Sequence, residues 1–186
     1  MPNVAICAPS AAFAKEDADR VLALAAAEFP GVRLHFHPQC FQSEGHFAGP
    51  DAARRDALVE CANDPAFDAV WFARGGYGAA RIAEEALARF DHAAQNKLFL
   101  GYSDGGTLLG GLYRNRVGQP VHAPMPADIR RKDGETAVRR TLAWLSGDKS
   151  GEEPVQDDHP RVAFNLMTLA MLCGTPLMPG LAGHVV

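Results

Sequence analysis

The chain has 186 residues, of which 47% are hydrophobic and 22% are charged, and its formal net charge is −4. This is the composition of a globular protein with one domain, or with one domain and part of another. The acidic balance and the lack of a basic stretch argue against a nucleic-acid partner, and no run of about 18 apolar residues is present that could span a membrane.

Strands and helices alternate along the predicted chain. In chain order, the sequence predicts a strand at 3–8, a helix at 15–29, a strand at 32–37, a helix at 51–62, a strand at 67–73, a helix at 79–90, a strand at 98–102, a helix at 107–113, a strand at 120–122 and a helix at 133–145. The runs 67–73 and 98–102 are apolar throughout, as in parallel strands that helices cover on both faces. The sequence therefore predicts an α/β domain with a mainly parallel sheet and flanking helices.

The last part of the chain differs in composition from the rest. Residues 149–161, KSGEEPVQDDHPR, are polar, acidic and contain proline, and we interpret them as a linker. The expected organisation is an α/β domain over 1–148, the linker, and the start of a smaller C-terminal domain over 162–186. The chain stops within an apolar run, 180–186, that is typical of the beginning of a strand. We therefore expect the protein to continue beyond Val186.

Cysteine and histidine usage indicates neither disulfides nor a metal site. Cys7, Cys40, Cys61 and Cys173 are far apart, and with no export signal at the N-terminus they are interpreted as reduced thiols of a cytoplasmic protein. His35 and His37 share one face of a predicted strand, but no third ligand is evident. His46, His92 and His159 lie in polar segments, and we expect them to contact solvent. No metal and no organic cofactor is predicted.

One short segment joins a predicted strand to a predicted helix in a way that indicates chemistry. Residues 101–105, Gly-Tyr-Ser-Asp-Gly, fit the nucleophile-elbow pattern in its required context, with a strand before and a helix after. A strained turn there lifts the Ser103 hydroxyl above the sheet edge, and the N-terminus of the next helix favours an oxyanion. The backbone N–H of Asp104 is the expected first oxyanion donor.

A second glycine-rich turn, 74–78 (RGGYG), follows the preceding strand, and we expect the N–H of Gly76 to be the second oxyanion donor. Two other interpretations stay open from the residues alone. Ser-Asp-Gly is also ordinary turn chemistry, and the glycine turn could hold a phosphate, although it lacks the spacing of the known phosphate loops. Arg74 could clamp a substrate carboxylate or anchor its own loop. His122 is the only attractive histidine for a base, and a buried, hydrogen-bonded histidine is the competing interpretation.

Four segments together resemble the LD-carboxypeptidase family of serine peptidases: ARGGYG at 73–78, GYSD at 101–104, HAPM at 122–125, and the stretch from NL at 165 to GTPLMPG ending at 180. The resemblance implies hydrolysis of the bond before the terminal D-alanine of murein tetrapeptides, during cell-wall recycling in the cytoplasm, by a homodimer. It implies that Ser103 is the nucleophile, that Gly76 and Asp104 form the oxyanion hole, and that Arg74, Gly75 and His122 line the substrate site.

The same resemblance implies a Ser-Glu-His triad whose Glu and His lie beyond Val186. Two rival functions remain at this stage. The first is a peptidase of the related branch that confers immunity to microcin-type peptide antibiotics. The second is a non-catalytic α/β module whose glycine turns bind an anion such as a phosphate or a carboxylate.

Overall fold

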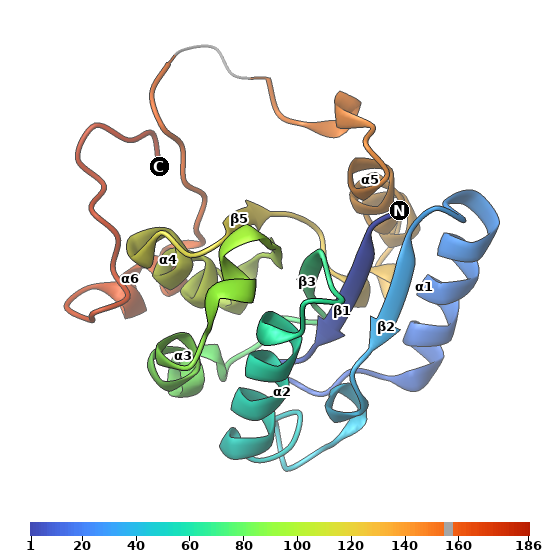
Figure 1. The fold of residues 1–186 in the computed structure, drawn as a ribbon, viewed down its shortest axis with the longest axis horizontal. Helices are drawn as coiled ribbons and strands as arrows, with labels where there is room; N and C mark the ends of the chain where they lie inside the picture. The colour runs from blue at the N-terminus through green and yellow to red at the C-terminus, as the bar shows by residue number, and fades with distance from the viewer. Residues whose placement is uncertain (155–157) are drawn as a thin grey trace.

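The computed structural model describes residues 1–154 and 158–186, and these ranges contain one five-stranded sheet with helices on both faces (Figure 1). The strands are β1 (Asn3–Cys7), β2 (Arg33–Phe36), β3 (Ala69–Phe72), β4 (Leu98–Gly101) and β5 (Gln119–His122). They lie in the order β2-β1-β3-β4-β5, and every adjacent pair is parallel. The predicted fold class, α/β with a mainly parallel sheet, is therefore confirmed.

Helices alternate with these strands, as the sequence predicts. Their bounds are α1 (Lys15–Glu28), α2 (Asp51–Asn63), α3 (Ala79–Ala88), α4 (Gly106–Asn115), α5 (Gly134–Leu145) and α6 (Leu166–Leu172). In Figure 1, α1 and α5 cover one face of the sheet, and α2, α3 and α4 cover the other. Among the described residues, no helix combines the length and the apolar character that crossing a bilayer would require.

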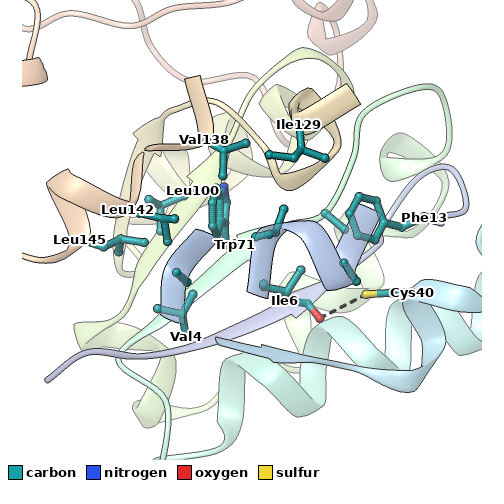
Figure 2. Close-up of a cluster of buried hydrophobic side chains, with 14 of the residues drawn as sticks. Val4, Ile6, Phe13, Cys40, Trp71, Leu100, Ile129, Val138, Leu142 and Leu145 are labelled. Atoms are coloured by element: carbon teal, nitrogen blue, oxygen red, sulfur yellow. Dashed lines mark hydrogen bonds between the residues drawn. The ribbon is translucent and has the colours of Figure 1, made fainter. Parts of the chain in front are cut away.

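The two faces of the sheet are both buried, which explains why the central strands are apolar throughout. Along β1, Val4 and Ile6 pack toward α1 and α5, whereas Ala5 and Cys7 pack toward the helices of the opposite face. Figure 2 shows Trp71 of β3 among the buried side chains on the face that α1 and α5 cover, a cluster that also contains Leu142 of α5. The indole N–H donates to the carbonyl of Pro124 at 2.8 Å, so the polar group of this fully buried ring is satisfied.

All strands are parallel, so their carboxyl ends meet at one edge of the sheet. Strand β2 lies on one side of β1 and strand β3 on the other, so the strand order reverses between β1 and β3. Parallel sheets of this kind bind ligands at such a switch point, next to the carboxyl ends of the two strands. The segments after β1, β3, β4 and β5 converge at this edge. They carry Ser10, the glycine turn 74–78, Ser103 and the end of β5 at His122.

The part of the chain after α5 lies against α4. A Cβ on Gly110 of α4 would come within 3.3 Å of the Phe164 ring, and Leu172 and Leu177 are buried in the same apolar cluster as α3 and α4. Of the predicted linker 149–161, residues 155–157 lie outside the described residues. The division into 1–148, linker and 162–186 stays a prediction.

We expected the run 180–186 to begin a strand. In the structure it forms a single isolated parallel bridge, between Arg161 and Val185, and not an extended β-ladder. Gly183 interrupts the extended backbone there, because its φ of +76° lies in the left-handed region. The helix α6 within the apolar stretch 164–173 was not anticipated from the sequence. Asn165 is the N-cap before its first residue, and the Asn165 side chain accepts a hydrogen bond from the N–H of Thr168.

Candidate active site

Ser103 occupies a strained turn between β4 and α4. Its φ is +58°, in the left-handed region that residues other than glycine seldom adopt, and the strain costs roughly 1–3 kcal/mol. The short turn Ser103–Gly105 leads directly into α4, so the hydroxyl is carried at the N-terminal end of this helix. Ser103 is half-buried, and the hydroxyl of Thr168 donates to its carbonyl at 3.0 Å.

The glycines on either side of the serine are explained by one aromatic ring on the neighbouring strand. A Cβ on Gly101 would lie 2.7 Å from Cδ2 of Phe72, and a Cβ on Gly105 would lie 3.0 Å from the same atom. The first distance is shorter than real Cβ atoms show, and the second is tighter than most real Cβ contacts, so the ring would have to shift. The Gly-x-Ser-x-Gly pattern therefore lets strand β4 and helix α4 close around Phe72.

The glycine turn after β3 lies against the nucleophile. A Cβ on Gly75 would come within 3.0 Å of both Cβ and Oγ of Ser103. Gly76 and Gly78 have φ values of +125° and +147°, which only glycine adopts without strain. The structure therefore brings together the two glycine-containing segments that the sequence predicts to form one site. The role of the Gly76 and Asp104 N–H groups as oxyanion donors stays a prediction.

Arg74 anchors its own loop to the segment that follows β1. Its Nη1 donates to the carbonyl of Ala12 at 3.0 Å. Partial burial lowers the pKa of the guanidinium, the nearby Arg130 lowers it further, and Asp17 opposes both effects. Of the two roles left open by the sequence, the structure shows the anchor, and the clamping of a substrate carboxylate stays a prediction.

His122 lies at the carboxyl end of β5, where it pairs with Gly101 of β4. Its ring centroid is 5.9 Å from that of Tyr102, and desolvation lowers the pKa of the imidazole, although the residue as a whole is exposed. The competing interpretation, a buried histidine hydrogen-bonded to backbone, is wrong. His122 lines a pocket of about 720 Å³ beside the elbow, whose walls include Tyr102, Arg131 and Trp144.

Three polar side chains at this edge were missed from the sequence. The Asp104 carboxylate is buried and accepts hydrogen bonds from the Ser10 hydroxyl at 2.5 Å and from the Ala79 N–H at 2.9 Å. His46 is exposed, but its Nε2 accepts from the N–H of Tyr77 at 3.2 Å, so it supports the glycine turn as well as facing solvent. Such contacts leave no local pattern in the sequence.

Arg54 of α2 is the third of these side chains, and it is fully buried. It donates to the carbonyls of Pro9 at 2.5 Å, Gly78 at 2.9 Å and Gly49 at 3.3 Å, and it pairs with Asp51. An arginine within a helix ordinarily faces solvent, so no sequence signal marked it. Here the guanidinium satisfies loop carbonyls beneath the candidate site.

The remaining histidines and cysteines do not assemble into a ligand set in the described ranges. His37 pairs with Glu60 at 3.1 Å and accepts from the N–H of Gln39, whereas the His35 ring packs on Phe67. No group of three or more His, Cys, Asp or Glu side chains within 1–154 and 158–186 is arranged to hold a metal ion. Four free thiols are present there: Cys7, Cys40 and Cys61 are buried, and Cys173 is exposed.

The family model and the curated relatives that match this chain all belong to the carboxypeptidases. The model of the LD-carboxypeptidase N-terminal domain matches residues 4–123. A Streptomyces coelicolor protein whose name assigns it provisionally to the carboxypeptidases is 42% identical over 141 residues, which cover 75% of this chain and 40% of that protein. The murein tetrapeptide carboxypeptidase of Pseudomonas aeruginosa is 26% identical over 189 residues, covering 93% of this chain and 61% of the relative. The chain thus spans about two fifths to three fifths of these relatives.

Solved structures share the fold at low sequence identity. The muramoyltetrapeptide carboxypeptidase of Oxalobacter formigenes superposes with a TM-score of 0.71 at 22% identity, covering 96% of this chain and 62% of its own. A variant of the microcin C7 self-immunity protein in complex with adenosine monophosphate superposes with a TM-score of 0.76 at 17% identity, covering 98% and 66%. At these identities the likeness establishes the fold alone.

Proposed function

The chain belongs to the LD-carboxypeptidase family, and we propose that it carries the nucleophile of a serine-type carboxypeptidase that hydrolyses L,D-peptide bonds. The proposed substrate is a murein tetrapeptide, from which the enzyme releases the terminal D-alanine. The observation that carries the proposal is the left-handed Ser103 at the junction of β4 and α4, with the backbone of Gly75 against its hydroxyl.

The proposed reaction follows from this geometry. The Ser103 hydroxyl attacks the scissile carbonyl, and the N–H groups of Asp104 and Gly76 hold the oxyanion that forms. The tetrahedral intermediate then expels D-alanine as its amine takes up a proton, and water hydrolyses the resulting acyl-enzyme. The resemblance to the family leads us to propose that the His and Glu that activate Ser103 follow Val186, so His122 is not the proposed base.

The substrate is proposed to lie between the glycine turn and the pocket beside His122. Gly75 lets the substrate carbonyl approach Ser103, since its missing side chain leaves the hydroxyl uncovered. Arg74 and His122 flank this approach from β3 and β5. A role in cell-wall recycling, a cytoplasmic location and a homodimeric assembly are further parts of the proposal, and they rest on the family resemblance.

A second candidate uses the same serine. The family resemblance leaves open a peptidase that acts on a microcin-type antibiotic, and the shared fold with the microcin C7 self-immunity protein is compatible with it. The third hypothesis, a non-catalytic anion-binding module, is less well supported. An anion site does not require a left-handed serine, whereas a nucleophile that must project from a sharp turn does.

The test uses the complete protein and its Ser103→Ala variant. We expect the parent to release D-alanine from murein tetrapeptide and to be labelled at Ser103 by a serine-directed phosphonate. The variant should lose at least roughly 10⁴-fold in turnover, because the nucleophile and its base act as a unit. Near-parental turnover by the variant would rule out Ser103. Hydrolysis of an aminoacyl-sulfamoyl nucleoside without release of D-alanine would favour the microcin-type substrate.

A further inference from the structure

We infer that Ser10 and Asp104 are positioning residues of this reaction: the Asp104 carboxylate, held between the Ser10 hydroxyl and the Ala79 N–H, keeps the nucleophile elbow and the glycine turn in register. The inference rests on the proposed function, because it assigns a role within the same site. It concerns the side chain of Asp104, whereas the oxyanion hole uses only the backbone of this residue.

The clamp joins three segments that are distant in the sequence. Oδ2 of Asp104 accepts from Ser10 Oγ at 2.5 Å, across 94 residues, and from the Ala79 N–H at 2.9 Å, across 25 residues. Ser10 follows β1, Ala79 is the first residue of α3, and Asp104 follows the nucleophile. Ser10 is fully buried and Asp104 is 5% exposed, so water does not compete for either hydrogen bond.

The position of the clamp relates it to the reacting atoms. Asp104 contributes the first proposed oxyanion donor through its backbone N–H, and Ala79 lies three residues after Gly76, which contributes the second. The Asp104 carboxylate therefore links the two proposed oxyanion donors. One donor belongs to Asp104 itself, and the other lies three residues before Ala79, to which the carboxylate is hydrogen-bonded. A displacement of about 1 Å between such groups can reduce turnover by roughly 100-fold, so their spacing has to be fixed.

Arg54 of α2 also contacts the two segments that contain Ser10 and Ala79. Its guanidinium donates to the carbonyls of Pro9 and Gly78, which directly precede Ser10 and Ala79. The Asp104 carboxylate accepts hydrogen bonds from Ser10 and Ala79, and the Arg54 guanidinium donates to the carbonyls of the residues just before them. Both groups therefore connect the same two loops.

A structural role alone explains a buried carboxylate poorly. Burial raises the pKa of Asp104, and the hydrogen bonds from Ser10 and Ala79 and the positive charge of Arg54 only partly oppose this. Burial thus disfavours the ionised form of this carboxyl group. What ionisation provides is shorter and stronger hydrogen bonds to both donors, which suits a group that must fix geometry.

The experiment compares four variants of the complete protein: Ser10→Ala, Asp104→Ala, Asp104→Asn and Asn63→Ala. Asn63 is the matched control, because its amide bonds the carbonyl of Arg89 and the N–H of Asp91 at the opposite end of α3. We expect Ser10→Ala to lower kcat about 10-fold and Asp104→Ala about 100-fold, with KM within about twofold of the parent. Asp104→Asn should recover only part of the loss, because an amide oxygen can accept both hydrogen bonds but carries no charge to strengthen them.

Amide hydrogen exchange gives a readout that does not depend on turnover. Ser10→Ala and Asp104→Ala should speed exchange at residues 75–79 at least about 10-fold, and Asn63→Ala should leave these amides unchanged. Parental kcat and parental exchange in Ser10→Ala, or an equal loss of kcat in Asn63→Ala, would overturn the inference. If the parent released no D-alanine and took no phosphonate label, the proposed function would fail, and exchange alone would still decide whether the clamp holds the turn.

Discussion

At the scale of single residues, the site depends on backbone conformations that residues other than glycine seldom adopt. Ser103 has a left-handed backbone, and Gly76 and Gly78 have positive φ values within the adjoining turn. Gly75 is different, because its φ lies outside the left-handed region and only space excludes a side chain. Substitution at Gly75 therefore tests access to the nucleophile without adding backbone strain.

The first prediction concerns Gly75→Ala. The new Cβ would lie 3.0 Å from Ser103 Oγ, so either the turn or the hydroxyl must move. We expect a loss of about 100-fold in D-alanine release and a similar loss in the rate of phosphonate labelling. Gly31→Ala is the control, since a Cβ at Gly31 meets nothing within 4 Å and should change neither rate. Unchanged labelling of Gly75→Ala would show that the turn does not border the nucleophile in solution.

The second prediction concerns the pH dependence of stability at Asp104. Its folded pKa is raised by burial above the unfolded value of about 3.9, so the native state binds this proton more tightly than the unfolded state does. The stability cost of ionisation is therefore absent below pH ~4. It develops as the pH rises through the folded pKa, and it is complete above that value.

Asp104→Asn has no such titration, so the stability of the variant relative to the parent should increase from pH 4 to pH 7. Urea unfolding of both proteins at the two pH values measures the difference. Arg54 and His46 face Asp104, and a positive charge on either of them favours its ionised form. A relative stability that decreases with rising pH would mean that these groups, with the Ser10 and Ala79 hydrogen bonds, outweigh burial.

At the scale of secondary-structure elements, the geometry of the elbow depends on how closely β3, β4 and α4 pack together. The Phe72 ring of β3 fills the space that side chains at Gly101 and Gly105 would otherwise occupy. The strand and the helix can approach each other only because both positions are glycine. The short turn that carries Ser103 is thus set by a ring on a neighbouring strand.

The third prediction tests this packing through a double-mutant cycle. Gly101→Ala places a Cβ 2.7 Å from Phe72 Cδ2, and such overpacking should cost about 1–3 kcal/mol of unfolding free energy. In a Phe72→Leu background the same substitution should cost at least ~0.5 kcal/mol less, because the smaller side chain yields. Urea unfolding of the four proteins gives the coupling. Additive costs would show that another contact excludes the side chain at Gly101.

At the scale of the whole molecule, two apolar clusters on opposite faces of the sheet hold the fold together, and residues 158–186 join only one of them. Leu172 and Leu177 pack into the cluster that contains α3 and α4. Leu166 and Met167, at the start of α6, remain 82% and 71% exposed. The hydroxyl of Thr168 bonds the carbonyl of Ser103, so this late segment also touches the candidate site.

The fourth prediction addresses the proposed division at 149–161. Leu172→Ala should destabilise the docking of 158–186 by about 2–5 kcal/mol, because the side chain is 1% exposed. We expect faster proteolytic cleavage within 158–186 and little change in the unfolding of residues 1–148. Mass spectrometry of timed digests, with thermal unfolding, measures both. A single transition that shifts as a whole would make residues 162–186 part of the α/β domain and contradict the proposed boundary.

Local patterns in the sequence were sufficient for the fold class and for the place of the elbow. The alternation of apolar strands and helices predicted the parallel sheet, since strand and helix periodicities are properties of contiguous residues. Gly101, Ser103 and Gly105 marked the strand–helix junction for the same reason. The helix at 166–172 was missed, because a short apolar stretch does not distinguish a helix from a buried strand.

Contacts between distant segments were decided only by the tertiary structure. The hydrogen bond from Ser10 to Asp104 spans 94 residues, and the reason for Gly101 is a ring on another strand. His46 supports the glycine turn, and Arg54 is buried, although each occurs in a segment that reads as solvent-facing. The sequence determined which elements form and which serine is held at a strand end. The sheet order brings those ends together, so only the folded chain determines which side chains hold that serine in place.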